Sequence, residues 1–154
     1  MSNLSLAGWL ERLEQLHPSA IDLGLNRCGE VARRLDLVDT GIITATVAGT
    51  NGKGTTVAVM ESVLCASGVH CGAFTSPHLI RFNERIRVDG QEVSDETIVA
   101  AFEAIERARE EISLTYFEFG ALAALWIFKT FDVEYQLLEV VLGGHLDAVK
   151  IIDA

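Results

Sequence analysis

A glycine-rich loop with a single lysine, Gly49–Thr56 (GTNGKGTT), contains the residue types that bind the phosphate groups of nucleotides. Glycines allow backbone N–H groups to approach phosphate oxygens, because no Cβ stands in the way. Lys53 can reach the β- and γ-phosphates, and the hydroxyl of Thr55 or Thr56 can face a magnesium ion. The loop therefore predicts a binding site for a nucleotide and Mg²⁺.

The loop departs from the strict phosphate-loop pattern GxxxxGK[ST] at two positions. Val47 stands where the pattern requires glycine, and Gly54 stands where it requires serine or threonine. The alternative is an ordinary turn with a solvated lysine. The context favours the phosphate site, because the loop follows an apolar run typical of a strand and leads into a helical pattern.

The segments around the loop predict how it is held. Ile42–Ala48 is a β-branched, nearly continuous apolar run, which is typical of a strand buried on both faces. Thr55–Ser67 has apolar residues at helical spacing, and Val69–Phe74 has the pattern of a second strand. The order of strand, loop, helix and strand predicts an α/β fold of the P-loop NTPase type, with a mostly parallel sheet flanked by helices.

The rest of the chain continues the alternation of helices and strands. Asp89–Gly90 predicts a tight hairpin turn between strands Arg85–Val88 and Glu92–Val93. Tyr135–Leu142 again has strand character. Further helices are expected at Ser5–Leu16, at Asn26–Leu35 with Asn26 as its cap, at Ser94–Glu111 with Ser94 as its cap, and at Phe117–Phe131.

Composition limits the classes of protein to consider. The chain has 154 residues, of which 49% are hydrophobic and 22% charged, as expected of one globular domain. A net charge of −10 argues against a general nucleic-acid binder, and the longest apolar run, Phe119–Phe128, is too short to span a membrane. Without a secretory signal pattern, a cytoplasmic location is expected. Cys28, Cys65 and Cys71 lack metal-ligand spacing and are expected to be reduced, structural thiols.

Five co-linear segments resemble the folate branch of the Mur ligase superfamily, which comprises folylpolyglutamate synthase and bifunctional dihydrofolate synthase. A phosphate loop with glycine after its lysine resembles the form found in this branch. The segments are Ile21–Leu25 (IDLGL), Gly49–Thr56 (GTNGKGTT), Thr75–Leu79 (TSPHL), Leu114–Glu118 (LTYFE) and Leu138–Val140 (LEV). The resemblance implies that residues 1–154 are the N-terminal part of the central ATP-binding domain, without the rest of that domain and without the C-terminal domain.

The resemblance also implies a reaction. In this family, ATP phosphorylates a carboxylate of a pteroate or folate, and the amine of L-glutamate then attacks the acyl phosphate to form an amide. The chain would accordingly use ATP and Mg²⁺ and would have dihydropteroate or folate and L-glutamate as small-molecule partners. The parent enzyme would be a monomer, and no nucleic-acid or membrane partner is expected. Such phosphoryl transfer depends on positioning and on cations beside the developing charge.

Particular residues take roles by the same resemblance. The ATP phosphates would contact Thr50, Asn51, Gly52, Lys53, Gly54 and Thr55, with Lys53 as the catalytic cation. The magnesium ligands would be Ser76 and Glu139, a hydroxyl and a carboxylate. Ser76 could instead be a turn residue, whereas a carboxylate in the apolar run around Glu139 is costly unless it is paired or bound to a metal. The pterin would lie against Ala20, Ile21, Asp22, Leu23, Thr115, Tyr116, Phe117, Leu146 and Asp147, although Tyr116 and Phe117 are also ordinary core residues.

One stretch departs from the family pattern. Where the family reads EVGLGGRLDATN, this chain has Val141, His145, Val149 and Lys150 in place of glycine, arginine, threonine and asparagine. Valine does not adopt the positive φ open to glycine, and histidine lacks arginine's permanent forked charge. We therefore expect a ligase fragment with weak or no activity; a non-catalytic nucleotide-binding module and a small-molecule kinase are the alternatives. The apolar run Tyr135–Leu142 is expected to present an exposed sheet edge that promotes association.

Overall fold

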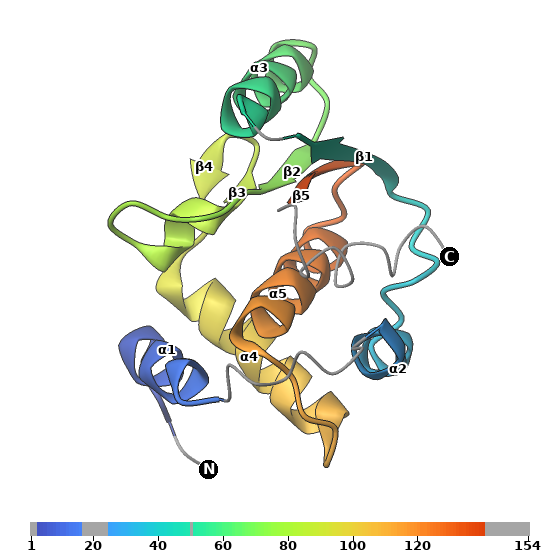
Figure 1. The fold of residues 1–154 in the computed structure, drawn as a ribbon. Coiled ribbons are helices and arrows are strands. Elements are labelled where there is room, and N and C mark those ends of the chain that lie inside the picture. Colours follow the sequence, from blue (N-terminus) through green and yellow to red (C-terminus); the bar gives the residue numbers. More distant parts are fainter. Residues whose placement is uncertain (1–2, 17–24, 50, 141–154) are drawn as a thin grey trace.

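One five-stranded sheet forms the centre of the part of the chain that the structure describes, residues 3–16, 25–49 and 51–140 of a computed structural model (Figure 1). The strand order is β1-β5-β2-β3-β4, in which β1, β5 and β2 are parallel and β3 and β4 form an antiparallel extension. The strands are β1 Ile43–Ala48, β2 Cys71–Phe74, β3 Ile86–Val88, β4 Gln91–Glu92 and β5 Tyr135–Val140.

Helices cover both faces of this sheet. In Figure 1, α3 lies on one face and α5 on the other with α4 beside it, while α1 and α2 lie beyond α4 and α5. The helices are α1 Leu6–Glu14, α2 Leu25–Arg34, α3 Lys53–Ala66, α4 Asp95–Arg109, α5 Tyr116–Thr130 and the short 3₁₀ helix η1 Phe82–Arg85. The order β1, loop, α3, β2 confirms the predicted α/β fold with its phosphate loop between a strand and a helix.

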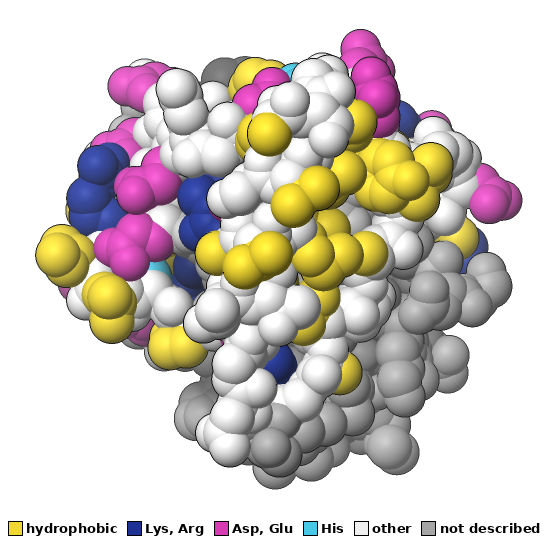
Figure 2. Space-filling model, turned by 90° about the horizontal axis from the view of Figure 1, so that it is seen from above, with side chains coloured by type: hydrophobic (Ala, Val, Ile, Leu, Met, Phe, Trp, Pro, Cys, Tyr) yellow, Lys and Arg dark blue, Asp and Glu magenta, His cyan; other side chains and the backbone are white. Residues whose placement is uncertain are grey.

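The face of the sheet beneath α3 has a small core. Val57 of α3 packs there with Ala73 of β2 and Leu137 of β5. The outer side of α3 is also apolar, because Val59 and Val63 are 58% and 59% exposed. Figure 2 views the molecule from the α3 side and shows hydrophobic side chains spread over this face. Thus α3 has apolar residues on both sides, although one side alone packs on the sheet.

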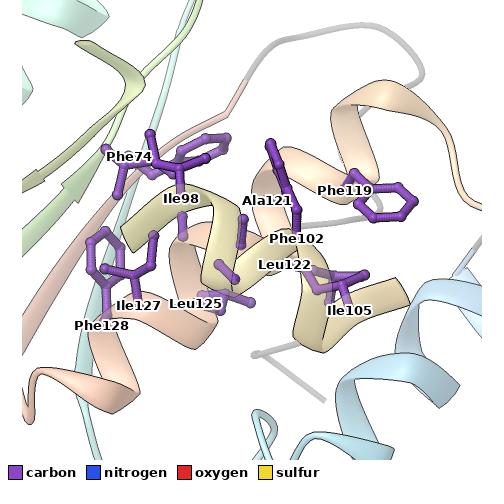
Figure 3. Packing of buried hydrophobic residues seen from close by; sticks show 14 of the residues in the cluster. Phe74, Ile98, Phe102, Ile105, Phe119, Ala121, Leu122, Leu125, Ile127 and Phe128 are labelled. Atoms are coloured by element: carbon purple, nitrogen blue, oxygen red, sulfur yellow. The ribbon is translucent and has the colours of Figure 1, made fainter. Parts of the chain in front are cut away.

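The main core lies between the sheet and α4 and α5 (Figure 3). Its large rings, Phe74 of β2, Phe102 of α4, and Phe119 and Phe128 of α5, are at most 1% exposed. At Gly72 the contact between β2 and α5 is so close that an added Cβ would lie 2.4 Å from the Phe128 ring. This contact holds the C-terminal part of α5 against β2, while the first turn of α5 meets the carboxyl end of β2 where the ring centres of Phe117 and Phe74 are 6.0 Å apart.

Local sequence signals account for several element boundaries. Ser94 caps α4 as predicted, since its Oγ accepts a hydrogen bond from the N–H of Thr97 at 3.2 Å. The Asp89–Gly90 turn joins β3 to β4 with both residues at positive φ, as the predicted hairpin requires. The prediction that Asn26 caps the second helix is wrong, because α2 already begins at Leu25.

β1 is an edge strand of the described sheet, which corrects the prediction that Ile42–Ala48 is buried on both faces. All its residues are partly or fully exposed, and Ile43 is 54% exposed. The exposed edge expected along Tyr135–Leu142 is likewise not found over the described residues Tyr135–Val140, since β5 lies between β1 and β2. A β-branched run predicts a strand but does not determine how many neighbours that strand has.

Candidate nucleotide and magnesium site

The phosphate loop connects the carboxyl end of β1 to the first turn of α3. Gly52 adopts the left-handed conformation (φ +75°), which favours glycine, and directly precedes the first helical residue, Lys53. The helix therefore begins two residues before the predicted Thr55, and no side chain caps it. Uncapped N–H groups at a helix N-terminus, together with the helix dipole, favour the binding of phosphate.

Two side chains of the loop are available to a ligand. Lys53 makes no ion pair or hydrogen bond with any described residue, and its Cγ lies 3.8 Å from where a Cβ on Gly49 would stand. The Thr56 hydroxyl donates to the Gly52 carbonyl at 3.0 Å, whereas the Thr55 side chain is exposed and has no such bond within the described part of the chain. Thr55 is thus the threonine that is free to face a nucleotide or its metal ion.

The sheet register brings Glu139 and Ser76 to the same edge as the loop. Glu139 of β5 pairs with Val47 of β1, next to the start of the loop. Leu138 pairs with Phe74, the last residue of β2, and Ser76 follows two residues later. Because β5 lies between β1 and β2, Glu139 lies between the phosphate loop and the Ser76 segment. In α/β folds, ligands bind at the carboxyl ends of parallel strands.

Both residues predicted as magnesium ligands carry buried polar groups. The Ser76 hydroxyl oxygen is buried without a hydrogen-bond partner in the described residues, and Glu139 is 6% exposed. Such groups cost free energy unless a partner satisfies them. A hydroxyl and a carboxylate suit Mg²⁺, which completes its coordination with water and phosphate oxygens. The two residues therefore fit this ion, and the described His, Cys, Asp and Glu residues form no cluster of three that could hold another.

Glu84 holds the segment that follows Ser76. Its carboxylate accepts hydrogen bonds from the backbone N–H groups of Arg81, Leu79 and Ile80, at 2.6, 2.9 and 2.9 Å. These bonds, that from Arg81 first, lower the pKa of Glu84 to about 2. The segment therefore has a defined backbone course over a wide pH range, although Leu79 and Ile80 point their side chains into solvent.

Thr115, Tyr116 and Phe117, the described residues predicted to line the pterin pocket, lie at the start of α5. The Thr115 hydroxyl caps this helix by accepting a hydrogen bond from the N–H of Glu118 at 3.1 Å. The ring centres of Phe117 and Phe74 are 6.0 Å apart, and burial raises the pKa of Tyr116. The three residues therefore lie beside the carboxyl end of β2, as a substrate wall next to the candidate metal ligands would.

Arg85 and His78 lie in the same region, although the sequence analysis did not select them. The Arg85 Nε donates to His78 Nδ1 at 2.8 Å, and its guanidinium carbon lies 5.6 Å from the centre of the Tyr116 ring. No sequence signal separates Arg85 from Arg81 and Arg87, which have the same side chain in the same short segment. Their partners, which tertiary packing decides, make the difference.

Several predicted positions lie outside the described residues. They are Thr50 of the loop, the predicted pterin residues Ala20, Ile21, Asp22, Leu23, Leu146 and Asp147, and the departures Val141, His145, Val149 and Lys150. Asn51 and Gly54 are described and exposed beside Lys53, as a phosphate loop requires. The site assembled here therefore consists of the loop, Glu139, Ser76 and the first turn of α5.

A shallow apolar hollow on the outer side of α3 adjoins the loop. It is lined by Gly54, Thr55, Ala58, Val59, Ser62 and Val63. It shares Gly54 and Thr55 with the loop, whereas Lys53 and the two candidate metal ligands do not line it. No helix within the described residues has the combination of length and apolar character needed to cross a membrane.

Comparison with known proteins gives one consistent result. No protein-family profile matches the chain. The dihydrofolate synthase/folylpolyglutamate synthase of Escherichia coli is 53% identical over 149 residues, which is 97% of this chain and 35% of that protein. The chain therefore spans about a third of the length of this relative.

Solved structures agree with the sequence comparison. The structure of E. coli FolC in complex with DHPP and ADP matches with a TM-score of 0.92 and 52% identity, over 99% of this chain and 37% of that one. A bifunctional folylpolyglutamate synthase/dihydrofolate synthase with Mn, AMPPNP and L-glutamate bound matches with a TM-score of 0.92 and 49% identity, over the same shares.

Proposed function

Because this chain belongs to the dihydrofolate synthase/folylpolyglutamate synthase family, we propose that it carries the ATP and magnesium site of such a ligase. Residues 1–154 would be the N-terminal part of the ATP-binding domain and would also supply one wall of the pteroate or folate site. The reaction proposed for the whole ligase joins L-glutamate to a pteroate or folate carboxylate, which ATP first converts to an acyl phosphate.

The observation that carries this proposal is the gathering of unsatisfied polar groups at one edge of the sheet. Among the described residues, Lys53 has no partner, the start of α3 has no side-chain cap, and the buried Ser76 hydroxyl has no hydrogen bond. The buried Glu139 side chain lies near the carboxyl end of β5, between β1 and β2. A nucleoside triphosphate with its metal ion would supply a partner for each of these groups. The relatives of known structure bind ADP, or AMPPNP with Mn.

In the mechanism that we propose, the described residues mainly position the reactants and compensate charge. The N–H groups at the start of α3 hold phosphate oxygens, and Lys53 neutralises negative charge on the terminal phosphates. A bound Mg²⁺, held by Glu139 and Ser76, would add positive charge at the phosphate oxygens. The first turn of α5 orients the pterin, so that the carboxylate at the other end of the substrate reaches the phosphate donor in line.

The proposal is tested in two stages with the purified chain. The first is calorimetric titration with AMPPNP in the presence and absence of Mg²⁺; we expect saturable binding that requires the metal ion. The second is an assay for ADP release and for glutamylated product with dihydropteroate, L-glutamate, ATP and Mg²⁺. Absence of nucleotide binding would contradict the proposal for this chain, whereas metal-dependent binding with little or no product is the outcome that the proposal expects.

Within this proposal we expect the 154-residue chain alone to form little or no product. It spans about a third of its relatives' length, and positioning of all three reactants supplies much of the rate enhancement in such reactions. Mass-verified glutamylated product formed at roughly one turnover per second or faster would contradict this expectation, since that is a rate typical of enzymes.

A further inference from the structure

Three arginines in the segment after β2 differ in their partners. Arg81 Nη2 lies 3.3 Å from Asp95 Oδ1, and Arg87 Nε lies 3.1 Å from Glu61 Oε2. Arg85 has no carboxylate partner in the described part of the chain. Two of the three arginines are thus paired with carboxylates within the fold, whereas the third, Arg85, is available to bind an anionic ligand.

The surroundings of Arg85 make its lack of a carboxylate costly. Its guanidinium carbon lies 5.3 Å from the centre of the Phe82 ring and 5.6 Å from that of Tyr116. Its Nε donates to His78 Nδ1, and its two terminal NH₂ groups have no acceptor among the described residues. Burial lowers the pKa of Arg85, yet arginine stays charged in proteins. Aromatic rings compensate a partly buried cation only in part, so an anion beside it would be stabilising.

Arg85 also contacts both the segment around Ser76 and the first turn of α5. The N–H of Thr75 donates to the Arg85 carbonyl at 2.9 Å, and Ser76, a candidate metal ligand, is the next residue of the chain. Tyr116, which the Arg85 guanidinium faces, is the first residue of α5 and belongs to the proposed pterin wall. The guanidinium itself contacts His78, two residues after Ser76, and faces Tyr116 of the proposed substrate wall.

We propose that the Arg85 guanidinium binds the carboxylate of the pteroate substrate. This inference rests on the proposed function and extends it to the group that is phosphorylated. Dihydropteroate has a pterin at one end and a single benzoate carboxylate at the other, and its two carboxylate oxygens match the two Arg85 NH₂ groups that have no acceptor in the described part of the chain. The terminal phosphate of ATP is the other anion expected near this place, so the experiment includes both ligands.

The test is a calorimetric comparison of ligands that differ by the carboxylate alone. The unaltered chain and its Arg85→Gln, Arg85→Lys and Arg81→Gln variants are each titrated with dihydropteroate, with the analogue in which hydrogen replaces the carboxylate, and with AMPPNP plus Mg²⁺. We expect Arg85→Gln to weaken dihydropteroate binding roughly tenfold to a hundredfold, as for a lost charged hydrogen bond. The affinity for the analogue and for AMPPNP should stay the same.

Control variants keep the result specific. Arg85→Lys keeps the charge without the fork, so it should retain part of the dihydropteroate affinity and is the variant to use if Arg85→Gln does not fold. Arg81→Gln removes a paired arginine from the same segment and should change no affinity. Equal losses for dihydropteroate and its analogue, no loss for either, a loss confined to AMPPNP, or failure of the unaltered chain to bind dihydropteroate would each overturn the inference. AMPPNP binding by the unaltered chain reports separately on the proposed function.

Discussion

The two ends of β2 differ in how their polar groups are bonded. At the amino end, His70 Nδ1 lies 2.5 Å from Asp89 Oδ2 and His70 Nε2 lies 2.7 Å from the Phe131 carbonyl oxygen. The Cys71 N–H donates to Asp89 Oδ1 at 2.9 Å. At the carboxyl end of the same strand, the Ser76 hydroxyl is buried with no partner in the described residues. These two ends lie a few residues apart in the chain. Within the described residues, the polar groups at the amino end have hydrogen-bond partners, whereas the Ser76 hydroxyl at the carboxyl end has none.

The contrast extends to the neighbouring residues at each end. Near the amino end, Cys65 and Cys71 are free thiols with Sγ atoms 3.7 Å apart, and burial raises the pKa of Cys71 to about 12. Both thiols are thus free, as the sequence predicted, and the raised pKa keeps the buried Cys71 thiol protonated. Near the carboxyl end, Lys53 and Arg85 have no carboxylate partner among the described residues. Polar groups that the fold satisfies hold it together, whereas those that it leaves unsatisfied indicate where a ligand belongs.

The largest effect is expected from Lys53→Ala. Removing the loop lysine, which pairs with no described residue, should weaken binding of AMPPNP–Mg²⁺ by about 2 kcal/mol, or roughly thirtyfold, while the melting temperature hardly changes. Lys129→Ala is the matched control, because Lys129 Nζ is already engaged by the fold, donating to the Asp36 carbonyl at 3.1 Å. Calorimetric titration of both variants checks this, and equal affinities for the two would remove Lys53 from the site.

Glu139→Gln should separate magnesium binding from packing. The substitution keeps the shape of a side chain that is 6% exposed and removes its charge. Folding should survive, because a buried charge without a partner destabilises the protein in the absence of the ion. AMPPNP affinity in saturating Mg²⁺ should fall about tenfold and lose most of its metal dependence. Magnesium titrations at fixed AMPPNP measure this, and an unchanged metal dependence would show that the carboxylate is not a ligand.

His70→Gln tests the amino end of β2, where the polar groups are hydrogen-bonded, and should affect stability rather than nucleotide binding. Its hydrogen bonds to the Phe131 carbonyl and to Asp89 raise the pKa of His70 above its ordinary value of 6.5, although partial burial opposes this. A raised folded-state pKa means that the stabilisation is complete below pH 6.5 and is lost as the pH rises through the folded value. We expect the variant to unfold about 1 kcal/mol more easily at pH 5.5.

The pH dependence provides the check on His70. Urea unfolding of the unaltered chain and of His70→Gln at pH 5.5 and pH 9 should show a difference in unfolding free energy that shrinks at the higher pH. AMPPNP affinity should be the same for both proteins at either pH. A difference that grows with pH would contradict the assignment of the imidazole as a donor to both acceptors.

The smallest effect is expected from Ser76→Ala. Replacing a buried hydroxyl that has no described partner should leave stability within about 0.5 kcal/mol or raise it slightly. AMPPNP–Mg²⁺ affinity should nevertheless fall by a few fold, because a neutral oxygen ligand is lost. Thermal melts and the same titrations measure both quantities. A clear loss of stability with unchanged affinity would make Ser76 a structural turn residue.

The sequence by itself determined the features that depend on neighbouring residues. The glycine loop before a helix, the Ser94 cap and the Asp89–Gly90 hairpin turn all rest on local backbone chemistry, and the structure confirms each. The α/β class follows from the order of such segments. The resemblance of five short segments to a ligase family agrees with the family that the comparisons show. The cytoplasmic location stays a prediction.

Tertiary structure alone decided which of these residues lie together and which have partners. The strand order places β1 at the described edge and Glu139 between the loop and the Ser76 segment, and strand patterns do not encode that order. Likewise, no local signal distinguishes Arg85 from Arg81 or Arg87. A side chain's partner is contributed by a distant part of the chain, so burial and pairing become visible only after the segments have packed.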